Sequence, residues 1–157
     1  MYWLISFLGI HLFPTVMVYL GCLPMFVIFN QPVVFPVLFY LGSVLLLFSV
    51  LLAYIADQQL RKFRLNAENN GTTIQTGLWK RSRHPNYLGE ILTWWGLFLM
   101  ALGCDLKFWW TGVGALSITL MFVFISIPMI EKYTLKRRLD YKDYQKQVPM
   151  LIPFLKW

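Results

Sequence analysis

The chain has 157 residues, of which 58% are hydrophobic, 18% aromatic and only 13% charged, and its formal net charge is +7. Soluble globular domains average roughly 45–50% apolar and about 25% charged residues. The composition therefore excludes a soluble enzyme, a disordered tail, a disulfide-stapled secreted module and a coiled coil. The two cysteines have no CxxC spacing and are interpreted as small hydrophobic residues.

Four apolar blocks approach or exceed the roughly 20 residues that a helix needs to cross a bilayer. They run from about residue 2 to 29, 33 to 56, 85 to 103 and 108 to 130. The first block lacks the basic start and the small-residue cleavage site of a signal peptide. The pattern predicts an all-α, polytopic integral-membrane bundle of about four transmembrane helices, followed by a short C-terminal interfacial helix.

Lysines and arginines are unevenly distributed between these blocks. Residues 57–84 hold six of the fourteen, residues 131–157 hold seven, and Lys107 is the remaining one. The positive-inside rule then predicts cytoplasmic N- and C-termini, in the inner membrane if the protein is bacterial. The expected organisation is one membrane domain, 1–157, with two helices in 1–56, a cytoplasmic loop at 57–84, two helices in 85–130 and a cytoplasmic basic tail at 131–157. This placement favours membrane lipids, and not nucleic acid, as the partner of the basic residues.

The second block is followed by Asp57, Arg61 and Arg64, which are spaced to share one face of a helix that continues past the membrane. One interpretation is an interfacial Asp–Arg pair on a solvated face, which stabilises a helix only weakly. The other is an anion clamp at the mouth of a site, because arginine binds phosphate or carboxylate groups bidentately. The spacing alone leaves both open.

The third block begins with a polar segment, Thr76–Glu90. Pro85 suits the first turn of a helix, and Asn86 and Glu90 then lie on one face. Glu90 lies more than a turn inside the membrane helix, where a carboxylate is costly, so it is expected to face a ligand-lined cavity. A helix-packing carboxylate with a partner is the alternative. His84, at the membrane boundary, is interpreted either as a group that titrates near neutrality or as a cap.

The fourth block ends at Glu131, which is expected at the same membrane face as Glu90. Tyr141 and Tyr144 are three residues apart on a short amphipathic helix that is expected to lie at the interface. The apolar run Met150–Leu155 is expected to fold back against the bundle. Interfacial anchoring alone would explain the tyrosines.

About residues 53–157 resemble the C-terminal half of the steroid 5-alpha-reductase-like membrane proteins, especially their uncharacterised bacterial branch. The resemblance is carried by Asp57, Arg61, Arg64, Gly77-Leu78, Asn86-Tyr87-Leu-Gly-Glu90, Trp94, Tyr144 and Leu151-Ile-Pro-Phe154. It implies that NADPH is bound by Asp57, Arg61, Arg64, Asn86 and Glu90. It also implies hydride transfer to a C=C bond of a lipid or steroid-like enone that enters from the membrane.

A second resemblance is to the isoprenylcysteine carboxyl methyltransferases and phospholipid methyltransferases. Arg83-His84-Pro85 and the downstream Glu131 carry it, although Lys132 stands where a second glutamate is expected. It implies S-adenosylmethionine as cofactor and a lipid or isoprenylcysteine-type carboxylate as methyl acceptor. The reductase is preferred because Asn86 and Glu90 fit that pattern better.

The steroid reductases take their proton donors from further N-terminal helices, so no catalytic acid is assigned here. A third hypothesis is a non-enzymatic, truncated homologue that acts as a membrane assembly subunit or completes its cavity as a homo-oligomer. No metal is expected. The predicted cofactor-binding set is Asp57, Arg61, Arg64, Arg83, His84, Asn86, Tyr87, Glu90, Glu131 and Tyr144.

Overall fold

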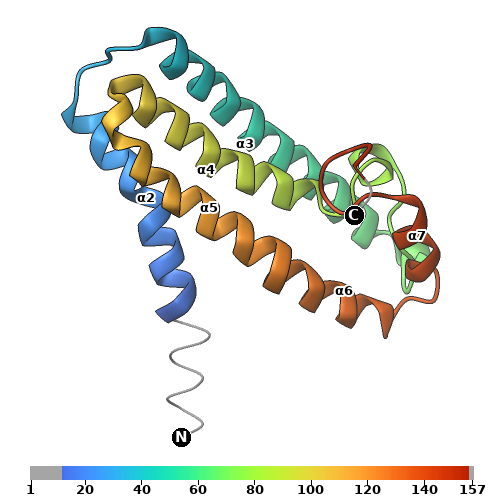
Figure 1. Ribbon diagram of the computed structural model, residues 1–157. Helices are drawn as coiled ribbons and strands as arrows, with labels where there is room; N and C mark the ends of the chain where they lie inside the picture. The colour runs from blue at the N-terminus through green and yellow to red at the C-terminus, as the bar shows by residue number, and fades with distance from the viewer. Residues whose placement is uncertain (1–11, 156–157) are drawn as a thin grey trace, which may run out of the picture. The chain divides into compact units, whose positions relative to one another are not determined.

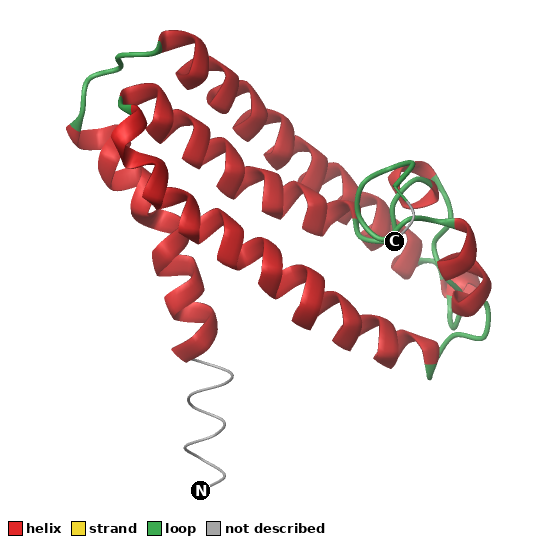
Figure 2. Ribbon diagram, viewed as in Figure 1, coloured by secondary structure: helices red, strands yellow, loops and turns green. Residues whose placement is uncertain are grey.

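The computed structural model describes residues 12–155 (Figure 1). Within them it consists of helices and connecting loops, with no strand (Figure 2). The α-helices are α2 (Phe13–Asn30), α3 (Pro36–Leu65), α4 (Pro85–Cys104), α5 (Gly112–Met121), α6 (Ile127–Leu135) and α7 (Tyr141–Gln147). Four described segments are long and apolar enough to cross a membrane: 13–30, 36–65, 85–104 and 106–135. The predicted all-α fold is therefore confirmed; the start of the first predicted helix lies outside the described residues.

Prolines mark where several helices begin. Pro36 and Pro85 are the first residues of α3 and α4, a position where the missing backbone N–H costs no intrahelical hydrogen bond. Pro24, in contrast, lies inside α2, which continues through it. α3 runs nine residues beyond the apolar block, to Leu65, so its last turns carry the polar face expected from the spacing of Asp57, Arg61 and Arg64.

The fourth span changes its helical geometry along its length. It begins as a 3₁₀ segment (Leu106–Thr111), continues as α5, passes through a π segment (Phe122–Ser126) and ends as α6. Pro128 follows the π segment by two residues. A proline cannot donate a hydrogen bond to the preceding turn, and local widening of the helix is a usual response.

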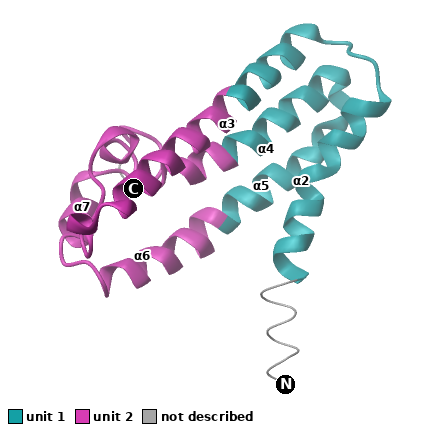
Figure 3. Ribbon diagram, turned by 180° about the vertical axis from the view of Figure 1, so that it is seen from behind, with its two compact units in different colours: residues 1–47, 91–121 teal, residues 48–90, 122–157 magenta. Residues whose placement is uncertain are grey.

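The chain forms two compact units, coloured separately in Figure 3. The first comprises residues 1–47 and 91–121, and the second comprises 48–90 and 122–157. Of the fourteen lysines and arginines in the sequence, all but Lys107 fall within the second unit's bounds. The polar chemistry of the protein is thus concentrated in that unit.

Small residues allow close helix approach in the first unit. A Cβ atom on Gly42 of α3 would lie 2.7 Å from the backbone nitrogen of Met100 in α4, and one on Gly114 of α5 would collide with Leu20 of α2. Close backbone approach of this kind is how apolar helices pack where lipid offers no hydrophobic driving force between them.

The second unit holds its loops through polar contacts with helices. Trp79, in a 3₁₀ turn (Gly77–Lys80), donates its indole N–H to the Ala56 carbonyl of α3 at 3.0 Å. Thr73 donates through its backbone N–H and its hydroxyl to the Asp140 carboxylate, at 2.7 and 2.9 Å. The Thr73–Asp140 bonds join residues 67 apart, and together with the Trp79–Ala56 bond they fix the loop before α4.

Candidate functional site

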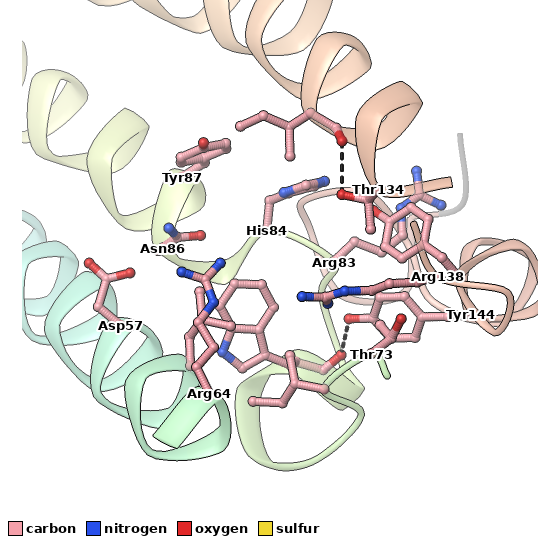
Figure 4. Close-up of a pocket in the computed structure, with 15 residues that line it drawn as sticks. Asp57, Arg64, Thr73, Arg83, His84, Asn86, Tyr87, Thr134, Arg138 and Tyr144 are labelled. Carbon is pink, nitrogen blue, oxygen red and sulfur yellow. Dashed lines mark hydrogen bonds between the residues drawn. The ribbon is translucent and has the colours of Figure 1, made fainter. Parts of the chain in front are cut away.

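A cavity of about 330 Å³ lies in the second unit (Figure 4). Four segments build it: the last turns of α3, the loop before α4 with the first turn of α4, the end of α6, and α7. Its lining residues are Asp57, Leu60, Arg64, Thr73, Ile74, Trp79, Arg83, His84, Asn86, Tyr87, Ile130, Thr134, Arg138, Tyr141 and Tyr144.

Glu131 of α6 lies behind one wall of the cavity, bonded to the lining residues Arg83 and His84. Its Oε1 atom lies 2.8 Å from Arg83 Nε and 2.9 Å from His84 Nε2, and it accepts a hydrogen bond from the Tyr141 hydroxyl at 3.1 Å. Its Oε2 atom accepts from the Gln145 amide at 2.7 Å. The carboxylate is buried, and buried charges persist in proteins when they are paired and hydrogen-bonded in this way.

Most of the hydrogen-bonding groups of Arg83 contact other parts of the protein. Besides its bond to Glu131, its Nη1 donates to the carbonyls of Gln145 and Val148, at 2.8 and 3.1 Å. Its backbone N–H donates to the Pro149 carbonyl at 2.9 Å. Arg83 therefore ties the loop before α4 to α6 and to the end of α7, which leaves little of its guanidinium for a ligand.

Asn86, in the first turn of α4, presents an unsatisfied acceptor. Its Oδ1 atom is buried and has no hydrogen-bond partner among the described residues. In Figure 4 the Asn86 and Asp57 side chains both point into the cavity. A buried polar atom without a partner is costly, so this atom marks a place where a ligand with a hydrogen-bond donor would be stabilised.

The cavity also offers positive charge and aromatic surface. Arg64 of α3 and Arg138, between α6 and α7, contribute guanidinium groups to its lining. The rings of His84 and Tyr87 are stacked, with centroids 5.5 Å apart and planes 7° apart. Trp79 forms a buried part of the wall. The arrangement combines anion-binding, acceptor and stacking groups, which suits a zwitterionic ligand that carries an aromatic ring.

Two tyrosines of α7 close the cavity and have perturbed ionisation. Burial raises the pKa of Tyr141, and the nearby Glu131 carboxylate, whose hydrogen bond it donates, raises that pKa further. Burial likewise raises the pKa of Tyr144, whose hydroxyl donates to the Trp79 carbonyl. Both phenols therefore stay protonated as donors throughout the neutral range.

These raised pKa values predict a loss of stability at alkaline pH. Unfolded tyrosines titrate near pH 10, and the folded state holds these two protons more tightly. Their contribution is complete below about pH 10 and falls as pH rises further, because the unfolded chain then releases protons that the folded chain keeps. The apparent melting temperature in detergent, measured from pH 8 to 11, should fall less steeply for Tyr141→Phe/Tyr144→Phe than for the wild type. The exposed pair Tyr40→Phe/Tyr54→Phe is the control; an unchanged slope in the α7 variant would contradict the assignment.

Seven of the ten predicted cofactor-binding residues line the cavity: Asp57, Arg64, Arg83, His84, Asn86, Tyr87 and Tyr144. Glu131 lies directly behind them, bonded to Arg83 and His84. Arg61 instead lines a neighbouring groove together with Asp57, Gln58 and Arg64. Glu90 is exposed and is not among the cavity's lining residues. Arg83, from the same polar segment as Glu90, pairs with Glu131.

Several lining residues were not among those predicted. The sequence predicts Tyr141 to be an interfacial aromatic residue, but its side chain is buried against Tyr144 and Val148. Arg138 stands in a basic pair, Arg137-Arg138, which in the sequence carries no sign of which residue faces inward. Thr73 is held by its hydrogen bonds to Asp140, which lies 67 residues away, and no local sequence pattern predicts such a pairing.

Comparisons with known proteins place the chain in a family. The family model described as "Protein of unknown function (DUF1295)" matches residues 1–148. A methanethiol S-methyltransferase from Crocosphaera subtropica (strain ATCC 51142 / BH68) is 32% identical over 129 residues, which cover 78% of this chain and 48% of that protein. The chain thus spans about half the length of this curated relative. No solved structure matches the chain significantly.

These findings correct the expected activity. The named relative is a methyltransferase, so the oxidoreductase class predicted from the reductase resemblance is wrong, and NADPH has no support. The physical reason is visible at Glu90: it favoured the reductase pattern, yet it is exposed and lies outside the cavity lining. The residues of the methyltransferase resemblance, Arg83, His84 and Glu131, are bonded together instead. With the family model covering nearly all of its length, the chain belongs to the DUF1295 family of membrane proteins with methyltransferase-like relatives.

Proposed function

We propose that the chain binds S-adenosylmethionine in the cavity of the second unit and transfers its methyl group to the sulfur of a small thiol. The observation that carries the proposal is the buried, unpartnered Asn86 Oδ1 in a cavity that also contains a carboxylate and three guanidinium groups. The 32% identity to a methanethiol S-methyltransferase over 78% of the chain supports both the reaction class and the acceptor.

The residues present fit the chemistry of this cofactor. Asp57 and Asn86 Oδ1 are acceptors that suit its ammonium and hydroxyl donors. Arg64 and Arg138 suit its carboxylate, and Trp79 and the tyrosines offer surfaces for its adenine ring. The cavity volume of about 330 Å³ lies at the lower end of the roughly 300–1,000 Å³ typical of small-molecule sites.

When bound, the cofactor supplies an electrophilic methyl group, so that a carbon–sulfur bond to the acceptor forms as the bond to the sulfonium sulfur breaks. The acceptor thiol must also lose its proton. Glu131 fixes the His84 ring through Nε2 at 2.9 Å, and with the hydrogen on Nε2 the other ring nitrogen, Nδ1, is the proton acceptor. His84 is thus the residue that we assign to receive the proton.

Ligand-dependent stabilisation tests the cofactor directly. The protein in detergent should show a higher melting temperature with S-adenosylmethionine, since a ligand that binds only the native state at about 100 times its Kd stabilises by about 2.7 kcal/mol. NADPH should give no shift. Asp57→Asn should reduce the shift, whereas Lys146→Ala, whose exposed side chain pairs with Asp143, should retain it. No shift with S-adenosylmethionine would contradict the proposal and favour the assembly-subunit hypothesis.

Methyl transfer is then measured with protein reconstituted in vesicles, S-adenosylmethionine labelled in the methyl group, and methanethiol as acceptor. Label should appear in the volatile thioether, and His84→Gln should lower the rate while keeping most of the melting-temperature shift. Binding without transfer to methanethiol would retain the cofactor assignment and overturn the acceptor.

A further inference from the structure

We propose that the cavity between the end of α3 and the end of α6 binds the phosphate headgroup of an anionic phospholipid. This headgroup cavity has a volume of about 370 Å³ and lies within the second unit. Its lining residues are Phe63, Arg64, Asn69, Asn70, Gly71, Ile130, Tyr133, Thr134, Arg137 and Arg138. The inference does not depend on the methyltransferase proposal.

The lining is strongly basic. It contains three arginines, and none of the described residues that line it is acidic. Arg137 lies over the Tyr133 ring, with its guanidinium carbon 4.1 Å from the ring centroid, so a cation–π contact holds it in place. Glu68, in the turn (Ala67–Asn69) after α3, accepts a hydrogen bond from Asn66 within that turn. The guanidinium groups of arginines bind phosphate oxygens bidentately.

The cavity lies where two membrane spans end. The apolar spans that contain α3 and α6 finish at Leu65 and Leu135, and both side chains are exposed. Leu139, next to Arg138, is 99% exposed. A fully exposed leucine beside two arginines suits the bilayer interface, where the leucine reaches acyl chains and the guanidinium groups stay at headgroup depth. This combination favours a lipid phosphate over a free anion.

The two cavities of the second unit share part of their walls. Arg64, Ile130, Thr134 and Arg138 line both, whereas Arg137 and Tyr133 line the headgroup cavity but not the candidate cofactor cavity. Substitution of Arg137 can therefore test lipid binding without removing a residue that we assign to the cofactor.

Lipid binding is measured on the full chain in neutral detergent. Phosphatidylglycerol, phosphatidylcholine or inorganic phosphate is titrated in, and bound lipid is counted by native mass spectrometry alongside the melting temperature. We expect phosphatidylglycerol to bind and to stabilise the protein, with phosphatidylcholine and inorganic phosphate much weaker. Arg137→Glu should weaken phosphatidylglycerol binding by more than the about fivefold that one basic residue near an anionic membrane surface contributes. Arg137→Lys, which keeps the charge but not the bidentate geometry, should recover only part of the loss.

Lys142→Glu makes the same change in net charge at an exposed position of α7 outside this cavity and should retain the wild-type affinity. If Lys142→Glu weakened binding as much as Arg137→Glu, the effect would be general surface electrostatics and the site would be rejected. Equal binding of phosphatidylcholine and phosphatidylglycerol would overturn the charge recognition. Equal stabilisation by inorganic phosphate would overturn the lipid as occupant.

Discussion

Replacing Glu131 with alanine is expected to lower the free energy of unfolding by about 3–5 kcal/mol, the usual cost of removing one partner from a buried ion pair. The carboxylate satisfies Arg83 and His84 from the loop before α4, and Tyr141 and Gln145 from α7. Its loss leaves the Arg83 guanidinium charged, nine-tenths buried and without its carboxylate. The free energy is measured by reversible denaturant titration in mixed micelles, followed by far-ultraviolet circular dichroism.

Glu131→Gln separates the charge from the hydrogen bonds. A glutamine at this position can still accept from Arg83, and the Gln145 amide can turn over to accept from its new N–H group. We expect this variant to lose less stability than Glu131→Ala. In a double-mutant cycle, Arg83→Met should cost much less in the Glu131→Ala background than in the wild type. Additive losses would contradict a direct coupling between the two charges.

The membrane architecture was largely predictable because bilayer thickness fixes the length of apolar blocks. Pro85, expected in the first turn of a helix, is the first residue of α4, and α3 begins at Pro36, three residues after the expected start of its apolar block. The end of α3 was underestimated by hydropathy, since six of its last nine residues are polar. They are helical through continuation of the backbone hydrogen bonds past the apolar block. The π segment before Pro128 depends on how the freed backbone groups are accommodated, which hydropathy does not register.

The predicted residues that line the candidate site comprise one group of close neighbours in the sequence and three distant residues, Asp57, Arg64 and Tyr144. Arg83, His84, Asn86 and Tyr87 lie within five consecutive residues, and all four line the cavity. Glu90 shows the limit of helical periodicity. It shares a face with Asn86 only approximately, and one further turn of α4 carries it away from the cavity lining.

Hydrogen bonds between residues far apart in the sequence were not predicted. Asp140 binds Thr73, and Tyr144 binds the Trp79 carbonyl, over separations of more than 60 residues. Such pairings depend on how loops fold over helix ends, and a single sequence does not encode them in any local spacing. The same folding makes Tyr141, expected at the membrane interface, a buried wall of the site beside Tyr144.

The site therefore divides into residues that hold it and residues that face a ligand. Arg83 and Glu131 are satisfied by protein groups, so their substitution should act first on stability. Asn86 Oδ1 has no such partner among the described residues, so its substitution should act first on binding. Comparing stability with ligand affinity for each variant separates the two roles.

Asn86→Leu is expected to leave the ligand-free protein as stable as the wild type, or more stable by about 1 kcal/mol. An unpartnered buried polar atom costs roughly 1–3 kcal/mol, and leucine fills a similar volume without that cost. The same change should weaken S-adenosylmethionine binding by about 10–100-fold, because a hydrogen bond to a charged group contributes about 1.5–3 kcal/mol. Stability is measured by denaturant titration without ligand, and affinity by melting temperature against ligand concentration.

Gln75→Leu is the matched control, since it removes the amide of an exposed residue that lines neither cavity of the second unit. It should leave the affinity for S-adenosylmethionine unchanged. A clear loss of ligand-free stability in Asn86→Leu would show that the amide already has a structural partner, and unchanged affinity would remove Asn86 from the binding site. A gain of stability together with a loss of affinity is the result expected when a side chain destabilises the ligand-free protein but is needed to bind the ligand.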